Sequence, residues 1–475
     1  MNESVRCRFL LAVVAATAIV GLLDERVSAR ETPAATALTE LDRYVAAADD
    51  SFAWQIVDRR DDEQATTLLV DLTSQTWRDA DEVDRTVWQH WLWIVVPRAA
   101  TSDTGLLVIS GGANGGDPPQ KPAAMLREIA LATNSVVAEV GQVPNQPLEF
   151  FGDGEPRYED NLLARSWQAA LKAHDPSWPG QLPMTKSAVR AMDAVQAALA
   201  TDPQLAQVDR FVVTGGSKRG WTTWLTAAVD DRVVAIAPVV IDMLNIRESM
   251  RNHHEAYGFW APAIGDYERA GLMDRMDDDA MTPLLNIVDP YSYRERMTMP
   301  KCIINASGDQ FFTPDSSQFY FAALPGEKLL AYVPNADHSL RNSNALETLT
   351  AFYASVVDGR PRPEVEWELA GETGWRVSCD PPPTRALLWH AVNPEARDFR
   401  LDKVGPIYKS RELSPDGDGK YSGVVARPEE GFAAVFVQLK CDIGAGVPLR
   451  VTTPVKIITA GGGAATSSGG VAGGE

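Results

Sequence analysis

Short, almost entirely apolar runs alternate with segments of helical periodicity over most of this chain, and this alternation is the feature that most restricts its possible folds. The runs LLVISGG, RFVVTGG and KCIINASGD are typical of strands that are buried on both faces. Segments between them, such as AAMLREIALAT and SAVRAMDAVQAALA, place apolar residues at steps of three or four, as amphipathic helices do. The pattern from about residue 36 to 358 therefore predicts an α/β fold with a mostly parallel sheet and helices on both faces.

Two regions depart from this alternation. Residues 243–299 are rich in Met and Tyr and contain no clear strand, so we expect a cap inserted over the carboxyl edge of the sheet, where open α/β sheets bind ligands. After Pro361 and Pro363, short segments such as VEWELAG, RALLWHAV, DFRL and AAVFVQLKC are separated by turn residues. They predict a C-terminal β-sandwich of immunoglobulin or fibronectin type over residues 364–460. Residues 461–475 form a Gly-rich, low-complexity tail that we expect to be disordered.

The N-terminus has the pattern of a secretory signal peptide. Arg6 and Arg8 precede the apolar run FLLAVVAATAIVGLL, and VSA offers small residues for cleavage near Ala29. The run is shorter than the roughly 20 residues of a membrane-spanning helix, although an uncleaved anchor remains an alternative. We therefore expect residues 1–29 to direct export to the periplasm or the extracellular space, with no transmembrane segment in the mature chain.

The net charge and the cysteines restrict the partners and the metal sites that we expect for this chain. The formal net charge of −20 argues against nucleic acid as a partner, because phosphate backbones favour basic surfaces. Cys379 and Cys441 fall in the C-terminal region, where an oxidising compartment would allow them to pair. The spacing of the cysteines contains no CxxC motif, so a cysteine-based zinc site is not expected. Neither the oligomeric state nor the pairing of the cysteines follows from the sequence.

Ser217 is the strongest candidate for a reactive residue. The apolar run RFVV leads through TGG into Ser217 and then into a segment of helical character, which is the strand, tight turn and helix order of the nucleophile elbow of α/β-hydrolases. The second glycine of the usual G-x-S-x-G pattern is displaced, since Arg219 stands in its place and Gly220 follows. This G-x-S-x-x-G spacing resembles the elbow of glucuronoyl esterases. On its own, the motif leaves a structural turn as an equal alternative.

An acid and a base follow in the order that α/β-hydrolases use, which is Ser, then Asp or Glu, then His. Asp309 comes directly after the run KCIINASG, and His338 follows the run KLLAYVPN. Because both residues follow late buried strands, we expect them to meet Ser217 at the carboxyl edge of the sheet as a catalytic triad. Asp242, at the end of VVAIAPVVID, is the alternative acid.

Two backbone N–H groups should stabilise the oxyanion that such chemistry creates. One is expected from Lys218, directly after the serine, and the other from Gly112 or Ala113 in the loop GGANGG. That loop lacks the G-x-G-x-x-G spacing of dinucleotide sites, and GGSKRG lacks the lysine–hydroxyl pair of a phosphate loop. No cofactor is therefore expected.

The predicted cap, residues 243–299, contains the segment RNHHEAYGFW. Its adjacent His253 and His254 would point about 100° apart on a helix, which makes a poor metal chelate, so no metal site is expected. Either histidine, together with Tyr257 or Trp260, is instead a candidate to contact substrate from the cap.

Long phrases of the chain resemble one known family. TGGSKRGWTTWLTAAVDDRVVAIAPVVIDMLN, DPYSYRERMTMPKCIINASGDQFFTPDSS and VPNADHS are similar to the PhoPQ-activated pathogenicity-related proteins, a branch of the α/β-hydrolase superfamily. The resemblance covers most of the chain, including its strand-rich C-terminal part. It implies an exported hydrolase-fold protein with Ser217, Asp309 and His338 as its triad, and it defines no substrate.

The sequence therefore favours a secreted serine hydrolase that cleaves a small-molecule or peptide acyl substrate through an acyl-enzyme. Two alternatives remain open. One is a peptidase similar to prolyl oligopeptidases, which share the chain order of the triad. The other is a catalytically silent binding or signalling protein on a hydrolase scaffold, since a fold does not fix a function.

Overall fold

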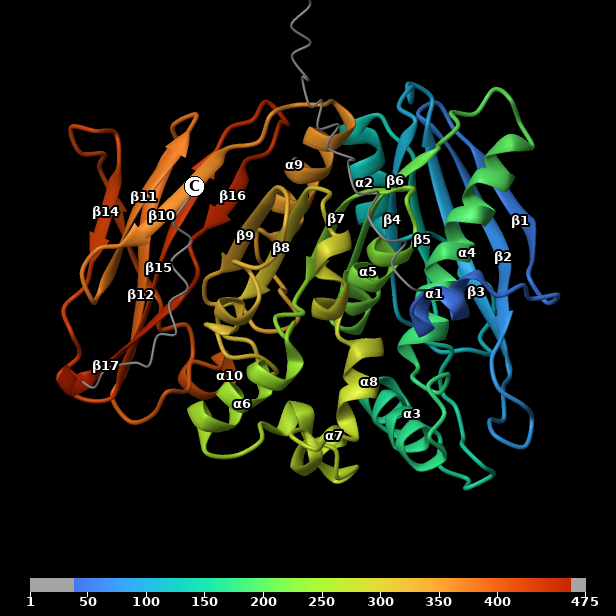
Figure 1. Cartoon of the computed structure of the whole chain (residues 1–475). Helices are drawn as coiled ribbons and strands as arrows, with labels where there is room; N and C mark the ends of the chain where they lie inside the picture. The colour runs from blue at the N-terminus through green and yellow to red at the C-terminus, as the bar shows by residue number, and fades with distance from the viewer. Residues whose placement is uncertain (1–37, 463–475) are drawn as a thin grey trace, which may run out of the picture. The chain divides into compact units, whose positions relative to one another are not determined.

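A nine-stranded mixed sheet organises the computed structural model, which describes residues 38–462 (Figure 1). Its strands, from one edge to the other, are β1 (Ala53–Asp61), β2 (Ala65–Thr76), β3 (Val87–Pro97), β5 (Val137–Val140), β4 (Thr104–Ile109), β6 (Arg210–Gly216), β7 (Val233–Val239), β8 (Lys301–Ala306) and β9 (Lys328–Val333). The strands from β5 to β9 run parallel, while β1, β2 and β3 are antiparallel to their neighbours. The prediction of a mostly parallel sheet is confirmed.

The parallel strands are buried because helices cover both faces of the sheet. Every residue of β4 and β8 is buried, as their apolar sequences predict. The helices of the α/β part outside residues 243–299 are α1 (Glu40–Ala46), α2 (Ala124–Thr133), α3 (Glu159–Ala173), α4 (Gln181–Ala200), α5 (Lys218–Val229) and α9 (Ala345–Val357). Helices α2 and α9 pack together on one face, and α4 and α5 pack together on the other.

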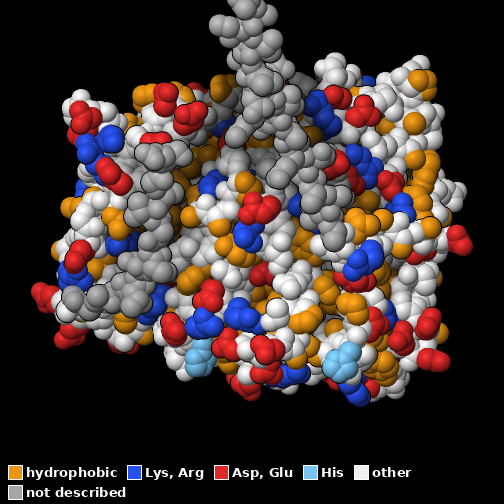
Figure 2. Space-filling model, in the orientation of Figure 1, with side chains coloured by type: hydrophobic (Ala, Val, Ile, Leu, Met, Phe, Trp, Pro, Cys, Tyr) orange, Lys and Arg blue, Asp and Glu red, His pale blue; other side chains and the backbone are white. Residues whose placement is uncertain are grey.

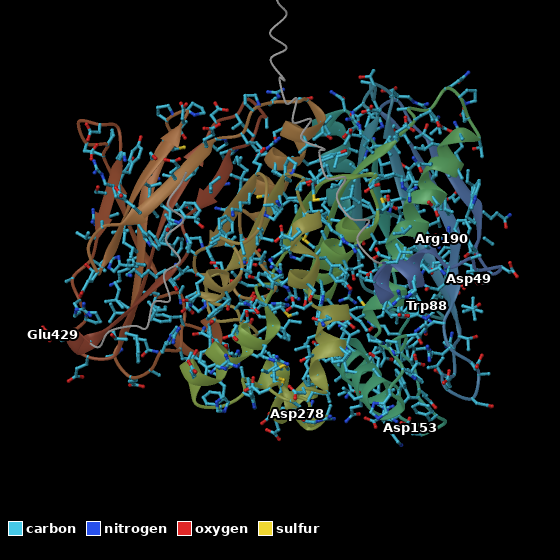
Figure 3. The ribbon with its side chains drawn as sticks, viewed as in Figure 1. Asp49, Trp88, Asp153, Arg190, Asp278 and Glu429 are labelled. Carbon is cyan, nitrogen blue, oxygen red and sulfur yellow. The ribbon has the colours of Figure 1, made fainter. Side chains whose placement is uncertain are left out.

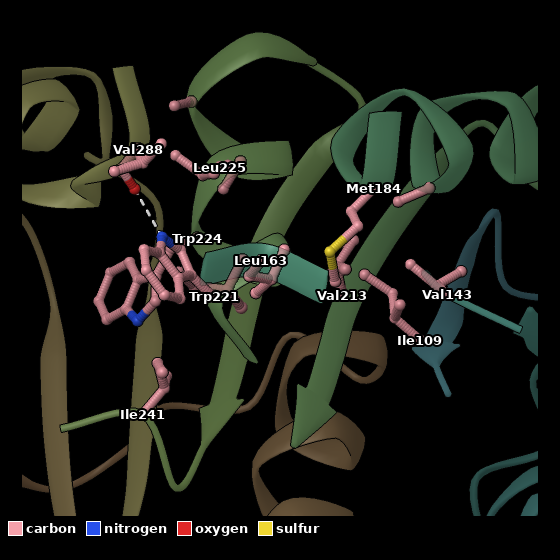
Figure 4. Packing of buried hydrophobic residues seen from close by; sticks show 14 of the residues in the cluster. Ile109, Val143, Leu163, Met184, Val213, Trp221, Trp224, Leu225, Ile241 and Val288 are labelled. Carbon is pink, nitrogen blue, oxygen red and sulfur yellow. Dashed lines mark hydrogen bonds between the residues drawn. The ribbon is translucent and has the colours of Figure 1, made fainter. Parts of the chain in front are cut away.

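Helix α5 lies deepest, and this position fixes the turn that precedes it. Trp224 and Leu225 are fully buried, and Trp221 is nearly so (Figure 4). The indole N–H of Trp221 donates to the carbonyl of Val288 at 2.5 Å. A helix surrounded by apolar side chains in this way has little freedom to rotate or slide. The first residue of α5 is therefore held rigidly at the carboxyl edge of the sheet.

The region from 243 to 299 forms helices and no strand, as the sequence predicts. Its elements are α6 (Ile246–Tyr257), η1 (Pro262–Ile264), α7 (Gly265–Arg269), η2 (Met273–Arg275), α8 (Met281–Val288) and η3 (Pro290–Arg296). Helix α3 contacts both α7 and α8, so the inserted helices rest on a helix of the main α/β part.

Two antiparallel sheets follow, as expected for the C-terminal part. One contains β10 (Glu364–Leu369), β11 (Gly374–Asp380) and β14 (Tyr421–Val424). The other contains β13 (Lys409–Leu413), β12 (Arg385–Asn393), β15 (Phe432–Cys441) and β16 (Leu449–Thr452), with β17 (Lys456–Thr459) also paired to β15. Residues of both sheets share one apolar cluster. The immunoglobulin-like identity of this arrangement stays a prediction.

In the C-terminal part, one segment predicted as a strand is not a strand, and two cysteines lie side by side. The segment DFRL is not a strand, because the Leu401 N–H donates to the carbonyl of Gly308 and the chain turns into the short helix α10 (Leu401–Val404). Cys379 on β11 and Cys441 on β15 lie side by side with their sulfur atoms 3.9 Å apart, and they are not bonded in this structure. Their pairing stays a prediction.

The C-terminal sheets pack onto the α/β part rather than standing apart from it. Strand β16 lies beside β9, and the backbone N–H of Tyr332 donates to the hydroxyl of Thr452 at 3.1 Å. Phe436 of β15 belongs to the same apolar cluster as Trp224 and Leu225 of α5. Residues 39–462 belong to a single compact unit.

The surface carries charges of both signs. Figure 2 shows acidic and basic side chains interspersed over one face, without a continuous basic area. No helix among residues 38–462 is long and apolar enough to cross a membrane. The predicted signal peptide and the residues from 463 onward in the predicted tail lie outside the described residues.

Candidate active site

Ser217 stands on a sharp turn between β6 and α5. Its backbone has φ 57° and ψ −126°, a conformation that costs a non-glycine residue about 1–3 kcal/mol. The Ser217 N–H donates to the carbonyl of Val239 at 2.9 Å, and the Ser217 carbonyl accepts from the N–H of Trp221 at 2.9 Å. These bonds to β7 and α5 hold the turn in place, so the serine side chain projects from the carboxyl edge of the sheet.

The displaced glycine of the motif has a steric explanation. A Cβ atom on Gly220 would lie 2.9 Å from the carbonyl oxygens of both Gly215 and Val239, and one on Gly215 would lie 2.7 Å from the backbone of Arg219. Helix α5 thus approaches β6 and β7 most closely at Gly220, one residue later than the usual pattern. Arg219 is free to carry a side chain because it points elsewhere.

Three side chains from different strand ends meet at the turn. The Nε2 atom of His338, which follows β9, lies 2.8 Å from the Oγ of Ser217. The Nδ1 atom of His338 lies 2.8 Å and 3.0 Å from the two carboxylate oxygens of Asp309, which follows β8. Asp309 is almost fully buried, and its carboxylate also accepts from the N–H of Phe311 at 2.8 Å. The carboxylate therefore favours the imidazole tautomer with a proton on Nδ1, which leaves Nε2 free to accept the serine proton.

Asp242, the alternative acid, is engaged elsewhere. Its buried carboxylate accepts hydrogen bonds from the hydroxyls of Tyr320 at 2.6 Å and Tyr332 at 2.5 Å. Burial raises the pKa of Asp242 to about 7, even though the two tyrosine hydroxyls lower it. Asp309, rather than Asp242, is the carboxylate in contact with His338.

A cavity opens beside Ser217, with an empty volume of about 540 Å³ including its mouth. The inserted helices and the residues that lead into them contribute Met243, Ile246, Met250, Ile264, Tyr267, Met273 and Met276 to its walls. Ile241, Trp167 of α3, Trp221 of α5, Phe311 and Phe312 complete the apolar part of the lining. Three of these aromatic rings meet edge to face, since the ring centroid of Trp167 lies 5.9 Å from that of Trp221 and 5.6 Å from that of Tyr267.

One wall of the cavity is polar. The ammonium of Lys218 lies 2.9 Å from Asp160 and 3.1 Å from Glu159. The guanidinium of Arg219 donates two parallel hydrogen bonds of 2.7 Å to Glu159 and a third, of 2.6 Å, to the carbonyl of Val143. Burial alone would raise the pKa of Glu159, but the hydrogen bonds and charge of Arg219 and the charge of Lys218 lower it to about 2. Of these four residues Lys218 and Asp160 line the cavity, and all four are paired with partners of opposite charge.

Of the residues predicted to donate to the oxyanion, Lys218 lines the cavity beside Ser217, whereas Gly112 and Ala113 do not. Lys218 is the first residue of α5, where backbone N–H groups have no partner within the helix and favour an anion. Gly112 and Ala113 do not line the cavity beside Ser217, and Ala113 instead borders a second depression with Trp91 and Gln142. Their loop is held by Gln142, whose N–H donates to Gly111. The second oxyanion donor remains a prediction.

The substrate-contacting role expected for His253, His254, Tyr257 and Trp260 stays a prediction. None of the four lines the cavity beside Ser217, where α6 presents Ile246 and Met250 instead. The His253 ring is buried against Trp260, and its Nε2 accepts from the N–H of Ala261 at 3.1 Å. Burial lowers the pKa of His253 to about 4, with the charge of Arg400 acting in the same direction. His254 is exposed.

Among residues 38–462, no group of three or more His, Cys, Asp or Glu side chains is arranged to hold a metal ion. The chemistry that this arrangement offers on its own is nucleophilic attack by a serine, assisted by a histidine as general base.

Comparison with known proteins decides the family. The sequence model of the PhoPQ-activated pathogenicity-related protein family matches residues 41–400. The chain belongs to this family. It is also similar to the autocrine proliferation repressor protein A of Dictyostelium discoideum, with 36% identity over 451 residues that cover 88% of this chain and 90% of the relative.

Solved structures resemble this PhoPQ-related chain more distantly. Acetyl xylan esterase 1 from a Thermoanaerobacterium species is 14% identical with a TM-score of 0.43, covering 63% of this chain and 86% of its own. A glucuronoyl esterase from Solibacter usitatus is 16% identical with a TM-score of 0.38, covering 65% of this chain and 86% of its own.

Most residues that line the cavity of this PhoPQ-related protein were not predicted from the sequence. Neither Trp221 on α5 nor the acidic pair of Asp160 and Glu159 on α3 was among the expected site residues. A signal was present for Trp221, which stands four residues after Ser217 and therefore on the same face of the helix. The acidic pair carried no such signal, because only the tertiary fold brings α3 to Lys218 and Arg219.

Proposed function

We propose that this protein is a secreted serine hydrolase that cleaves an ester or amide through an acyl-enzyme. The observation that carries the proposal is the position of His338, whose two ring nitrogens lie within hydrogen-bond distance of Ser217 and Asp309. A serine hydroxyl is a weak nucleophile unless an adjacent base takes its proton, and this arrangement supplies that base together with a carboxylate to orient it.

The proposed reaction has two halves. The Oγ of Ser217 attacks the substrate carbonyl carbon while its proton passes to Nε2 of His338, and the N–H of Lys218 donates to the oxyanion that forms. The tetrahedral intermediate collapses, and the leaving alcohol or amine takes the proton from His338. Water then attacks the acyl-enzyme in the same way, which releases the carboxylic acid and restores Ser217. Asp309 orients the imidazole and stabilises its cationic form throughout.

Export is part of the proposal. The pattern of residues 1–29 is that of a signal peptide, and the Dictyostelium relative bears a name that refers to an autocrine action. Both features are consistent with a protein that works outside the cytoplasm.

The same name favours a second candidate function, a signalling protein whose activity does not need the hydrolase site. On that hypothesis the triad geometry would be a remnant of the fold. The two hypotheses differ in what substitution of Ser217 does to hydrolysis.

The test is steady-state hydrolysis of a panel of 4-nitrophenyl esters and peptide anilides by the unmodified chain and by Ser217→Ala and His338→Ala. The proposal predicts measurable kcat/KM on at least one class of substrate and a loss of about 10,000-fold or more in each variant, with unchanged thermal melting. Absence of hydrolysis across the panel, or full activity in Ser217→Ala, would contradict it.

A further inference from the structure

The cavity beside Ser217 restricts which acyl groups the proposed hydrolase can accept, and its walls indicate their chemistry. The inserted region, residues 243–299, has an apolar side that lines the cavity and a charged side that is exposed. Met273 and Met276 of this region are buried and line the cavity, whereas the acidic residues 277–279 that follow them are exposed. Figure 3 shows Asp278 at the outer edge of the molecule. The inserted helices therefore turn their apolar side inward, toward Ser217.

Methionine is prominent on this inward side. Met243, Met250, Met273 and Met276 all line the cavity and are each less than a tenth exposed. Thioether side chains are unbranched and polarisable, and they adapt to apolar groups of different shape. Aromatic rings of Trp167, Trp221 and Tyr267 also line the cavity. Such walls gain free energy by covering apolar substrate surface and offer few partners to polar atoms.

The polar wall adds no free charge. Lys218 is paired with Asp160 and Glu159, Arg219 is paired with Glu159, and Asp160 also accepts from the hydroxyl of Tyr267 at 3.1 Å. A charged substrate group entering the cavity would lose its hydration without finding an unpaired partner of opposite sign. Burial of an unpaired charge is strongly unfavourable, so this wall selects against charged groups.

The triad fixes which end of the substrate enters the cavity. His338 must return its proton to the leaving group, so the leaving group has to lie at Nε2 of His338. The cavity is bounded by α5, α3, the inserted helices and the rings of Phe311 and Phe312, and His338 is not part of its lining. The ring of Phe311 lies 4.3 Å from that of His338, between centroids. The His338 side chain is 18% exposed, so its side of the site opens toward solvent. The acyl group, rather than the leaving group, is thus the part that faces the cavity.

We propose that the cavity is an acyl-binding site for uncharged, apolar acyl groups, aliphatic or aromatic, while the leaving group remains in solvent. This inference rests on the proposed function, because it assumes that Ser217 forms an acyl-enzyme. It names the substrate class of that site.

The experiment measures kcat/KM for 4-nitrophenyl acetate, butyrate, hexanoate and octanoate, and for the 4-nitrophenyl monoester of succinate, whose acyl group matches butyrate in length but ends in a carboxylate. Each added methylene that is buried should raise kcat/KM about two- to fourfold as far as hexanoate. The succinate ester should react about 100-fold more slowly than the butyrate ester.

Two variants test the location of the acyl group. Met250→Trp should remove the preference for hexanoate over acetate by filling the cavity. Met125→Trp is the matched control, because Met125 is a partly buried methionine on α2 that does not line the cavity. It should leave the chain-length profile unchanged. Thermal melting shows whether either variant is folded, and the series on the unmodified chain decides the proposal by itself.

The failures of the two proposals are distinguishable. A chain that is labelled at Ser217 by a fluorophosphonate but prefers acetate or succinate, or hydrolyses no ester of the series, overturns the acyl-site inference and leaves the nucleophile in place. A chain that is neither labelled nor active overturns both proposals.

Discussion

At the scale of single residues, the choice of carboxylate is the feature on which the site depends most. Asp309 and Asp242 both follow strands of the parallel sheet, and both are buried. They differ in their partners, since Asp309 contacts the His338 imidazole and Asp242 contacts two tyrosine hydroxyls. The sequence alone cannot separate them, because both stand at strand ends on the same edge.

Substitution separates the two carboxylates by activity. Asp309→Asn should lower kcat about 10,000-fold, because an amide can hold His338 in the unproductive tautomer and cannot stabilise the imidazolium. Asp242→Asn should keep kcat within about tenfold, since its side chain does not touch His338. Steady-state kinetics on an ester substrate measure both effects. A deeper loss in Asp242→Asn than in Asp309→Asn would show that the roles are reversed.

Asp242 should also reveal itself in the pH dependence of stability. Burial raises its folded pKa to about 7 from an ordinary value of 3.8. The folded state therefore keeps a proton that the unfolded state releases, so this contribution to stability is complete below about pH 4 and is lost as the pH rises through about 7. Asn imitates the protonated form at every pH.

The free energy of unfolding of Asp242→Asn should accordingly gain on that of the unmodified chain between pH 4 and pH 8, by at most about 4 kcal/mol. Urea denaturation at a series of pH values measures the difference. If it stayed constant over this interval, Asp242 would not be protonated in the folded state.

At the scale of elements, the elbow between β6 and α5 decides where Ser217 stands. The close approach of α5 to the sheet at Gly220 predicts that Gly220→Ala lowers the free energy of unfolding by about 1–3 kcal/mol, because its Cβ would meet two backbone oxygens. Gly216→Ala is the matched control, since a Cβ at Gly216 meets nothing within 4 Å. Chemical denaturation of both variants provides the test. Equal stabilities would contradict the packing described for the elbow.

The buried elements were predictable from the sequence, and the exposed or tertiary ones were not. The runs that became β4, β6 and β8 are apolar throughout, so burial on both faces was evident from residue type. Strand β1 escaped prediction because its sequence AWQIVDRRD is polar and its edge position leaves much of it exposed. DFRL was predicted as a strand, but its last residue, Leu401, bonds to the carbonyl of Gly308 and begins α10. Only the tertiary fold creates this contact.

The candidate site was likewise predictable from the sequence only in part. The order of Ser217, Asp309 and His338 after buried strands reflects topology, which the sequence encodes locally. The cavity lining does not, because it gathers side chains from α3, α5 and the inserted helices that are distant in the chain. His253 and Tyr257 were chosen by residue type, whereas the packing of α6 turned Ile246 and Met250 inward.

At the scale of the whole molecule, the C-terminal part braces the loops that carry the triad. The Leu401 N–H donates to the carbonyl of Gly308, the residue before Asp309. The side chain of Asn335, three residues before His338, exchanges two hydrogen bonds of 2.9 Å with the backbone of Tyr408. The acid and the base thus both stand on loops that rest on residues 401–408.

Loss of this contact should affect catalysis more than substrate binding. Asn335→Gly keeps the positive φ of 53° accessible but removes both bonds to Tyr408, so kcat should fall about tenfold with little change in KM as the His338 loop loosens. Asn342→Gly is the matched control, since Asn342 also has a positive φ, of 56°, but is exposed. Steady-state kinetics compare the two variants. Equal kcat values would mean that the C-terminal part does not position the base.

Covalent labelling tests the central claim most directly. The unmodified chain is treated with a fluorophosphonate, digested, and mapped by mass spectrometry. The account predicts a single phosphonate adduct on the Oγ of Ser217, lost in His338→Ala, because that hydroxyl borders a cavity and lies beside an imidazole that a carboxylate orients. The hydroxyl of Ser74 also lies 2.9 Å from an imidazole, that of His90, but Ser74 is fully buried. An adduct on another serine, or an unlabelled native chain, would contradict it.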